Sequence, residues 1–200
     1  MIPETPLGAG PTGHEQTPLS TPDRLQGASV GASPLHVLRF LAATLRAKAV
    51  VEVGTGSGES ALWLLRGMVP DGLLTSIDAD ASVQRVARAT LREAGVPAGR
   101  TRLIAGRAIE LMPRLTAGGY DLISVNIATT DYPQYLELGL RLLRPGGVIV
   151  FAGIQLAGPD PASAMAQAVR ALVREVQSDD GLVPVTLATG PGLLAVTKRA

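Results

Sequence analysis

Hydrophobic and polar positions along the chain follow two periods, which predict strands and helices in alternation. Short apolar runs are typical of buried strands, whereas apolar residues spaced three or four apart are typical of amphipathic helices. We predict helices over residues 33–47, 58–68, 81–95, 108–115, 132–144 and 161–177. We predict strands over residues 49–53, 72–78, 101–106, 120–126, 147–153, 181–188 and 192–199.

The order of these elements predicts the fold class. A helix between successive strands implies a parallel sheet that is covered on both faces. The last two strands differ, because only Thr189, Gly190 and Pro191 separate them and so short a link cannot form a parallel crossover. The pattern therefore predicts a Rossmann-like, doubly wound α/β fold with helices on both faces and a final antiparallel strand.

The first part of the chain has a different composition. Residues 1–27 are rich in Pro, Gly and Thr and have little periodic apolar content, so we expect a flexible tail there. Residues 28–200 would then form one domain. No basic segment followed by an apolar segment opens the chain, and no apolar run is long enough to span a membrane. We expect a cytoplasmic protein without a membrane partner.

Charge and residue usage exclude several function classes. The chain has 18 basic and 17 acidic residues without a basic stripe, and only 3% aromatic residues, so a nucleic-acid surface is not expected. It has no cysteine, which excludes disulfides, thiolate metal sites and cysteine nucleophiles. The two histidines are His14, in the predicted tail, and His36, in the first predicted helix. His36 is either an ordinary helix-face residue or a candidate base.

The segment VVEVGTGSGES, residues 50–60, is the clearest candidate binding loop. An apolar strand ends in Gly54, Thr55, Gly56 and Gly58, and a helix follows at once. Glycines let the backbone turn sharply and approach a ligand, and a helix N-terminus offers free N–H groups. A tight turn without a ligand is the alternative.

Two ligand classes compete for this loop. A dinucleotide fingerprint needs G-x-G-x-x-G, but its third glycine position holds Glu59 and the third glycine comes one residue early. Glu52 lies inside the strand, two residues before the first glycine. The resulting E-x-G-x-G-x-G resembles motif I of class I S-adenosylmethionine-dependent methyltransferases. That resemblance implies that Glu52 and the loop contact the aminoacyl and ribose portion of the cofactor.

Two further segments are candidate cofactor contacts. Asp78 ends the second predicted strand, where a carboxylate can accept both hydroxyl protons of a ribose, although capping the next helix is the alternative. Asp80 is the better candidate for that cap. In the methyltransferases that the chain resembles, a turn of small residues after the third strand meets the adenine. Gly106, Arg107 and Ala108 occupy that turn here, and Arg107 would stack on the base or point to solvent.

Residues 28–199 resemble the catechol-type and caffeoyl-CoA-like O-methyltransferases, in particular those of actinobacteria. The segments that carry the resemblance are the loop region, RTRLIAGRAIELMPRL, YDLISVN, YPQYLELGLRLLRPGGVIVF and the terminal hairpin. It implies a seven-stranded sheet of order 3-2-1-4-5-7-6 with the last strand antiparallel. It also implies that Ser60 meets the cofactor carboxylate, that Val30 to Ser33 approach the amino end, and that the protein could form a homodimer.

The family's divalent cation lacks its ligands in this chain. The resemblance aligns the family's D-A-D-K pattern with Asn126, Ala128 and Thr129, and its D-N pair with Ala152 and Gly153. Mg²⁺ is a hard cation that proteins usually hold through carboxylates. We therefore predict that no metal is bound, and that Asn126 instead accepts a hydrogen bond from the cofactor ammonium.

The sequence thus predicts a methyltransferase that uses S-adenosylmethionine to methylate a hydroxyl of a small molecule, without a metal. Candidate bases are Asp131, which could instead cap the helix that follows it, and His36. A protein that binds the cofactor but is catalytically silent is the alternative. An NAD-dependent oxidoreductase is disfavoured by Glu59 and by the terminal hairpin.

Overall fold

The computed structural model describes residues 33–154 and 162–199. All the described residues belong to one compact unit, Ala32–Ala200. The predicted tail, residues 1–27, and the candidate cofactor contact Val30 therefore lie outside the described residues. The strands are β1 (Ala49–Val53), β2 (Leu73–Asp78), β3 (Thr101–Ala105), β4 (Tyr120–Val125), β5 (Leu143–Ala152), β6 (Leu182–Leu187) and β7 (Leu193–Lys198). The α-helices are α1 (Pro34–Thr44), α2 (Glu59–Gly67), α3 (Ala81–Glu93), α4 (Ala108–Leu111), α5 (Tyr132–Leu142) and α6 (Ala164–Ser178).

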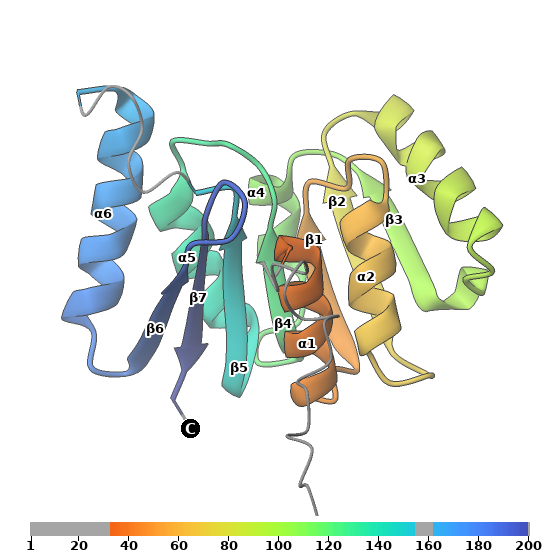
Figure 1. Cartoon of the computed structure of the whole chain (residues 1–200), viewed down its shortest axis with the longest axis horizontal. Helices are drawn as coiled ribbons and strands as arrows, with labels where there is room; N and C mark the ends of the chain where they lie inside the picture. The colour runs from red at the N-terminus through yellow and green to blue at the C-terminus, as the bar shows by residue number, and fades with distance from the viewer. Residues whose placement is uncertain (1–32, 155–161, 200) are drawn as a thin grey trace, which may run out of the picture. The chain divides into compact units, whose positions relative to one another are not determined.

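The strands form one sheet of order β3-β2-β1-β4-β5-β7-β6, as predicted (Figure 1). Neighbouring strands from β3 to β5 are parallel, and β7 runs antiparallel to both β5 and β6. In this order β1 and β4 lie side by side at the centre, with their connections leaving in opposite directions. That arrangement is the switch point of a doubly wound sheet, where ligands bind at the carboxyl ends of the strands.

Helices cover both faces of the sheet because successive side chains of a strand point to opposite faces. Val50 packs in the hydrophobic cluster that includes α1 and α2, whereas Val51 packs in the cluster that includes α5 and α6. In Figure 1, α1 and α2 lie in front of the sheet and α5 lies behind it. A fully buried valine, leucine or isoleucine contributes about 1.5–3 kcal/mol, so these two layers hold the central strands in place. None of the described helices is both long and apolar enough to cross a bilayer.

Local signals account for several helix ends. The Ser33 side chain accepts a hydrogen bond from the Leu35 amide at 3.4 Å, and Pro34 is the first residue of α1. The Asp80 side chain caps α3 by accepting a hydrogen bond from the Ser82 amide at 2.7 Å. Both are the short polar residues that satisfy free N–H groups at a helix start.

The predicted and observed elements differ most in two regions. The helix predicted over residues 132–144 ends at Leu142, and β5 begins at Leu143 rather than at residue 147. The pairing of β4 with β5 shifts register between Tyr120 and Leu122, so the Pro-Gly-Gly segment forms an irregular stretch inside the strand instead of a link before it. The helix predicted over residues 108–115 is α4 followed by a 3₁₀ turn, Met112–Arg114.

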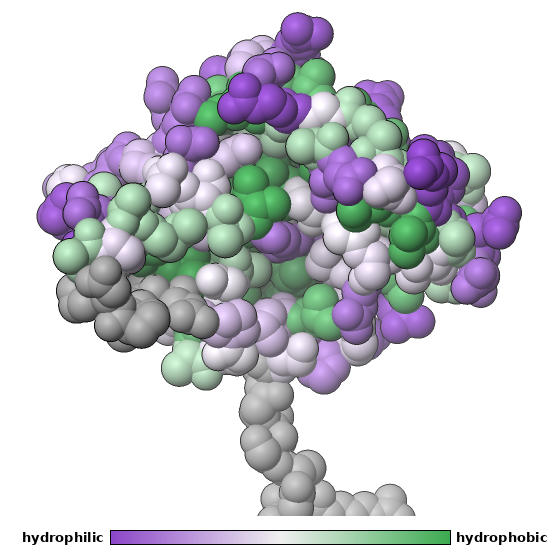
Figure 2. Space-filling model, turned by 90° about the horizontal axis from the view of Figure 1, so that it is seen from above, coloured by the Kyte–Doolittle hydropathy of each residue, from purple (hydrophilic) through white to green (hydrophobic). Residues whose placement is uncertain are grey.

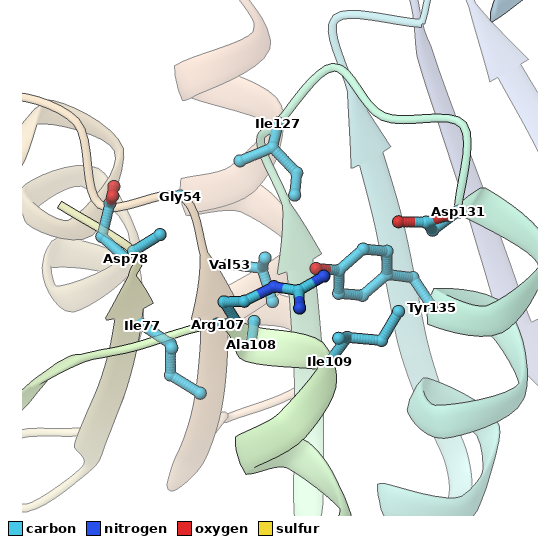
Figure 3. A pocket seen from close by; sticks show the side chains of 11 residues that line it. Val53, Gly54, Ile77, Asp78, Arg107, Ala108, Ile109, Ile127, Asp131 and Tyr135 are labelled. Atoms are coloured by element: carbon cyan, nitrogen blue, oxygen red, sulfur yellow. The ribbon is translucent and has the colours of Figure 1, made fainter.

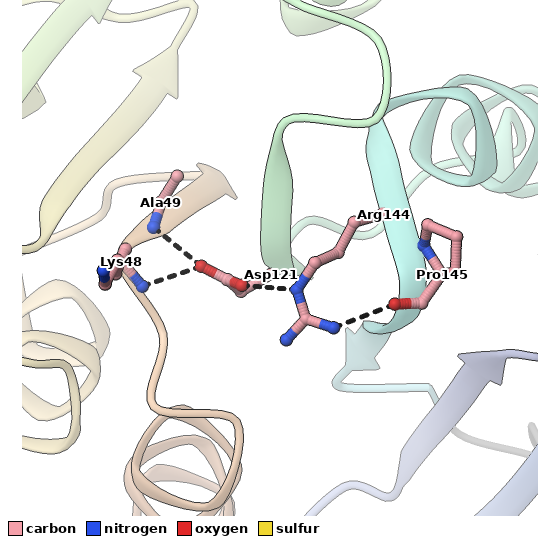
Figure 4. Close-up of polar contacts among 5 residues, drawn as sticks. All are labelled: Lys48, Ala49, Asp121, Arg144 and Pro145. Atoms are coloured by element: carbon pink, nitrogen blue, oxygen red, sulfur yellow. Dashed lines mark hydrogen bonds and ion pairs between the residues drawn. The ribbon is translucent and has the colours of Figure 1, made fainter. Parts of the chain in front are cut away.

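Asp121 holds the amino ends of three strands together (Figure 4). Its Oδ2 accepts hydrogen bonds from the amides of Lys48 and Ala49 at 2.7 and 3.0 Å, and its Oδ1 accepts one from Nε of Arg144 at 2.7 Å. The carboxylate therefore links the starts of β1, β4 and β5. Because these strands are parallel, the link also sets how their carboxyl ends line up at the opposite edge.

Candidate cofactor and active site

The loops after β1, β2, β3 and β4 meet at the carboxyl edge of the sheet. Figure 2 looks onto this edge, where apolar surface near the centre is surrounded by polar residues at the rim. Gly54, Gly56 and Gly58 of the loop after β1 have φ angles of 88°, 52° and 86°, which favour glycine. A Cβ on Gly58 would lie 2.9 Å from Cα of Ala87, whereas a Cβ on Gly56 would meet nothing within 4 Å. Gly58 thus permits close packing of α2 on α3, and Gly56 leaves open space above the loop.

Asp78 holds the glycine loop in its conformation. Its Oδ2 accepts hydrogen bonds from the amides of Thr55 at 2.9 Å and Gly56 at 3.3 Å, and its Oδ1 accepts one from the amide of Asp80 at 3.0 Å. An ionised carboxylate has about four acceptor positions. The remaining acceptor position is on Oδ1. Asp78 can therefore accept a hydrogen bond from one ribose hydroxyl while its hydrogen bonds to the loop amides remain in place.

Glu52 lies beneath the same loop and is fully buried. Its carboxylate accepts hydrogen bonds from the hydroxyls of Ser60 and Ser76, each at 2.6 Å, and from the amide of Asn126 at 3.2 Å. Burial raises the pKa of Glu52 to about 7, and the Asp78 charge adds to the rise, although these three hydrogen bonds oppose it. The carboxyl group is therefore poised between its neutral and charged forms near neutral pH.

The donors around Glu52 form a chain of hydrogen bonds that point toward it. The Thr55 hydroxyl lies 2.7 Å from that of Ser76, and the Ser124 hydroxyl donates to Oδ1 of Asn126 at 2.8 Å. Sequence reasoning missed both serines. The signal was a serine inside each of two largely buried strands, and the parallel register places Ser76 and Ser124 directly beside Glu52 on its two flanks.

A cavity of about 220 Å³ opens beside the loop (Figure 3). In the figure, Asp78 and Asp131 lie on opposite sides, with the side chains of Arg107, Ile127 and Tyr135 between them. It is lined by Val53, Gly54, Ile77, Asp78, Ala79, Arg107, Ala108, Ile109, Ile127, Asp131 and Tyr135. The cavity thus brings together candidate site residues from the glycine loop, the carboxyl end of β2, the turn after β3 and the start of α5.

The turn after β3 has a backbone conformation that favours glycine. Gly106 has a φ of 151°, and its amide donates to the carbonyl of Asp78 at 2.8 Å. Arg107 forms an ion pair with Glu110 at 2.9 Å, and both side chains are mostly exposed. Ala108 is buried and begins α4.

The two candidate bases lie in different surroundings. His36 is exposed on α1 and makes a T-shaped contact with Trp63, with the ring centroids 4.7 Å apart; it does not line the cavity. Asp131 occupies the N-cap position of α5, but its side chain makes no capping hydrogen bond, contrary to the alternative considered from sequence. Its Oδ2 lies 3.4 Å from the Thr129 hydroxyl, and the carboxylate lines the cavity.

The side chains present do not fit a divalent cation. Both polar atoms of the Asn126 amide are engaged, one with Ser124 and the other with Glu52 and Ser60. Ala128, Ala152 and Gly153 carry no ligand atom in their side chains. Across residues 33–154 and 162–199, no three His, Asp or Glu side chains are grouped as a metal would require.

Comparisons with known proteins identify the family to which the chain belongs. A family model described as O-methyltransferase matches residues 17–199. A Mycolicibacterium vanbaalenii protein named among the O-methyltransferases is 46% identical over 166 residues, covering 81% of this chain and 74% of that protein. The O-methyltransferase TomG from Streptomyces achromogenes, which is involved in tomaymycin synthesis and was crystallised with S-adenosylmethionine (SAM), is 29% identical with a TM-score of 0.72. That match covers 82% of this chain and 78% of TomG.

A Klebsiella pneumoniae protein assigned to the O-methyltransferases has 29% identity and a TM-score of 0.76, over 87% of this chain and 83% of that chain. The region that the family model matches, residues 17–199, includes every described strand and helix. The chain therefore belongs to the O-methyltransferase family.

Proposed function

We propose that this protein binds SAM and transfers its methyl group to a hydroxyl of a small molecule, without a divalent cation. The observation that carries the proposal is the pair of carboxylates around the glycine loop. Glu52 lies buried beneath the loop and Asp78 binds its backbone from the neighbouring strand end. SAM combines an ammonium, a sulfonium and a ribose, which are groups that carboxylates bind through charge and hydrogen bonds.

Each part of the site would hold one part of the cofactor. Asn126 Oδ1 accepts one hydrogen bond from Ser124 and has a second lone pair, which would accept a hydrogen bond from the cofactor ammonium, and Ser60 would meet the cofactor carboxylate. Asp78 would accept a ribose hydroxyl through Oδ1. Ala108 and Arg107, together with the Gly106 backbone, would surround the adenine at the cavity. The cofactor, when bound, supplies a methyl group on a sulfonium, which is a good leaving group.

A reaction without a metal depends on alignment and on removal of the hydroxyl proton. Holding two reactants in line supplies much of the rate of such a transfer. The proton acceptor must lie within hydrogen-bond distance of the hydroxyl. His36 and Asp131 are the candidates, and a pH–rate profile of the variants His36→Gln and Asp131→Asn would separate them.

Calorimetry tests the cofactor assignment. We expect S-adenosylhomocysteine to bind the full chain and NAD not to bind. Asp78→Asn should weaken binding, whereas Asp71→Asn, a matched change at an exposed acid in the turn before β2, should not. Binding of NAD in place of S-adenosylhomocysteine would refute the proposal.

A methyl-transfer screen tests the reaction. Phenols and hydroxylated acids are incubated with SAM in EDTA or in Mg²⁺, and formation of S-adenosylhomocysteine is measured. We expect equal rates in both conditions with a productive acceptor. A strict requirement for Mg²⁺ would refute the metal-free reaction. Cofactor binding without transfer to any acceptor would favour the catalytically silent alternative.

A further inference from the structure

The cavity beside the glycine loop has the size of one part of a cofactor. Its volume is about 220 Å³, below the roughly 300–1,000 Å³ of a pocket that holds a whole drug-sized ligand. Asp78 lies on one side of it, and apolar side chains including Ile77 and Ile127 form much of its lining. A ribose bound at Asp78 would therefore direct its purine into this cavity, toward the opposite side.

The opposite side carries two polar groups, one from the N-cap residue of α5 and one from its first turn. Asp131 and Tyr135 are four residues apart at the start of the helix, so they lie on one face. The Asp131 carboxylate does not cap the helix, and its Oδ2 accepts a long hydrogen bond of 3.4 Å from the Thr129 hydroxyl. Figure 3 shows this carboxylate and the Tyr135 hydroxyl both directed toward the cavity.

Tyr135 is a buried residue whose hydroxyl reaches the cavity (Figure 3). Burial raises the pKa of Tyr135 and so does the nearby Asp131 charge, whereas the Arg107 charge and a hydrogen bond from the Ile109 amide lower it. A tyrosine hydroxyl carries one O–H donor, so Tyr135 can donate a hydrogen bond to a group bound in the cavity that it lines.

The two groups complement the amino edge of adenine. Adenine presents its N6 amino group as a donor beside N7 as an acceptor, whereas a 6-oxo purine presents an acceptor in place of the amino group. We propose that Asp131 accepts a hydrogen bond from N6 and Tyr135 donates one to the ring nitrogen beside it, so that this pair selects adenine in the cofactor. The proposal rests on SAM being the cofactor, and it makes Asp131 a cofactor-recognising residue instead of the base.

Calorimetry with two ligands tests the selection. S-adenosylhomocysteine is compared with S-inosylhomocysteine, which has an oxygen in place of the amino group. A well-formed pair of base contacts discriminates by about 1–3 kcal/mol, so we expect wild type to prefer the adenine compound roughly 10- to 100-fold. Asp131→Asn can donate to the 6-oxo group, so we expect that variant to lose the preference or reverse it. Tyr135→Phe should weaken adenine binding while the chain remains folded, because the change keeps the buried ring.

Glu137→Gln provides the matched control, since Glu137 is an exposed acid of the same helix that does not line the cavity. We expect that variant to keep the wild-type preference. An unchanged preference in Asp131→Asn, with S-adenosylhomocysteine still bound, would overturn the inference and leave the cofactor assignment standing. Failure of wild type to bind either ligand would instead overturn the proposed function on which the inference rests.

Discussion

Replacing Glu52 by glutamine should change how the stability of this protein depends on pH. The unfolded chain has an ordinary glutamate pKa of 4.5, whereas burial raises that of folded Glu52 to about 7. A difference of that size corresponds to about 3 kcal/mol. Below the unfolded pKa the group is neutral in both states and costs nothing. As the pH rises through the folded pKa, the buried carboxyl must ionise, and that part of the stability is lost.

The pH range in which this effect can be measured lies above the range in which ordinary carboxylates titrate. Between about pH 5.5 and pH 8, the linkage relation assigns Glu52 a loss of about 2 kcal/mol in unfolding free energy. Asp78 is the charged neighbour that contributes to the raised pKa, and it acts in the same direction as burial. Glu52→Gln keeps the size of the side chain and removes the titration.

Denaturant unfolding at the two pH values provides the assay, with fluorescence of Trp63, the only tryptophan, as the probe. The wild-type protein should lose about 2 kcal/mol more than Glu52→Gln between these pH values. The difference between the two proteins removes the contributions of the two histidines, which are common to both. Glu59→Gln, at an exposed acid that begins α2, is the control that should behave as wild type. Equal pH dependence in wild type and Glu52→Gln would refute the argument.

Other substitutions separate the structural and binding roles of neighbouring groups. Gly58→Ala should destabilise the fold by more than about 2 kcal/mol, because its Cβ would lie 2.9 Å from Ala87 at a φ of 86°. Gly56→Ala has open space and should cost about 1 kcal/mol while weakening cofactor binding, which unfolding and calorimetry would measure side by side. Asp121→Ala should cost about 2–3 kcal/mol, since two strand amides and Arg144 lose their acceptor; a loss below ~0.5 kcal/mol would contradict this. Hydrogen bonds from Ala49, Arg144 and Lys48 outweigh burial and lower the pKa of Asp121, so its contribution should disappear only as the pH falls below the ordinary aspartate range.

The sheet could be predicted from the sequence because its signals are local. Each strand is a short apolar run, each intervening helix has its own period, and the three-residue link before residue 192 requires an antiparallel pair. The glycine loop could also be predicted from the sequence, because positive φ angles and close approach of the backbone to another group favour glycine. The irregular start of β5 could not be predicted from the sequence. Pro145 and the two glycines after it are typical of a helix end, and they belong to a strand only because β5 pairs with β4.

The surroundings of Glu52 required knowledge of strand register. Ser76 and Ser124 are ordinary residues in their own segments, and they become its partners because the parallel register places them on either side of it. The role of Asp121 was hidden for the same reason, since its partners lie in strands that are distant in sequence. Local periodicity predicts which residues are buried, whereas the contacts between buried polar residues depend on how the strands are aligned.

Asn126 shows why a single substitution should not restore the family's metal site. Its amide donates a hydrogen bond to Glu52 at 3.2 Å, so an aspartate there would place two carboxylates side by side beneath the loop. We expect Asn126→Asp to lose about 1–3 kcal/mol of unfolding free energy near pH 8, more than Asn126→Ala, because the alanine removes the donor without adding a like charge. Ala128, Ala152 and Gly153 would still supply no side-chain ligand, so millimolar Mg²⁺ should stabilise neither variant. Stabilisation of Asn126→Asp by Mg²⁺ in denaturant unfolding would contradict the conclusion that the asparagine belongs to the Glu52 network and not to a residual metal site.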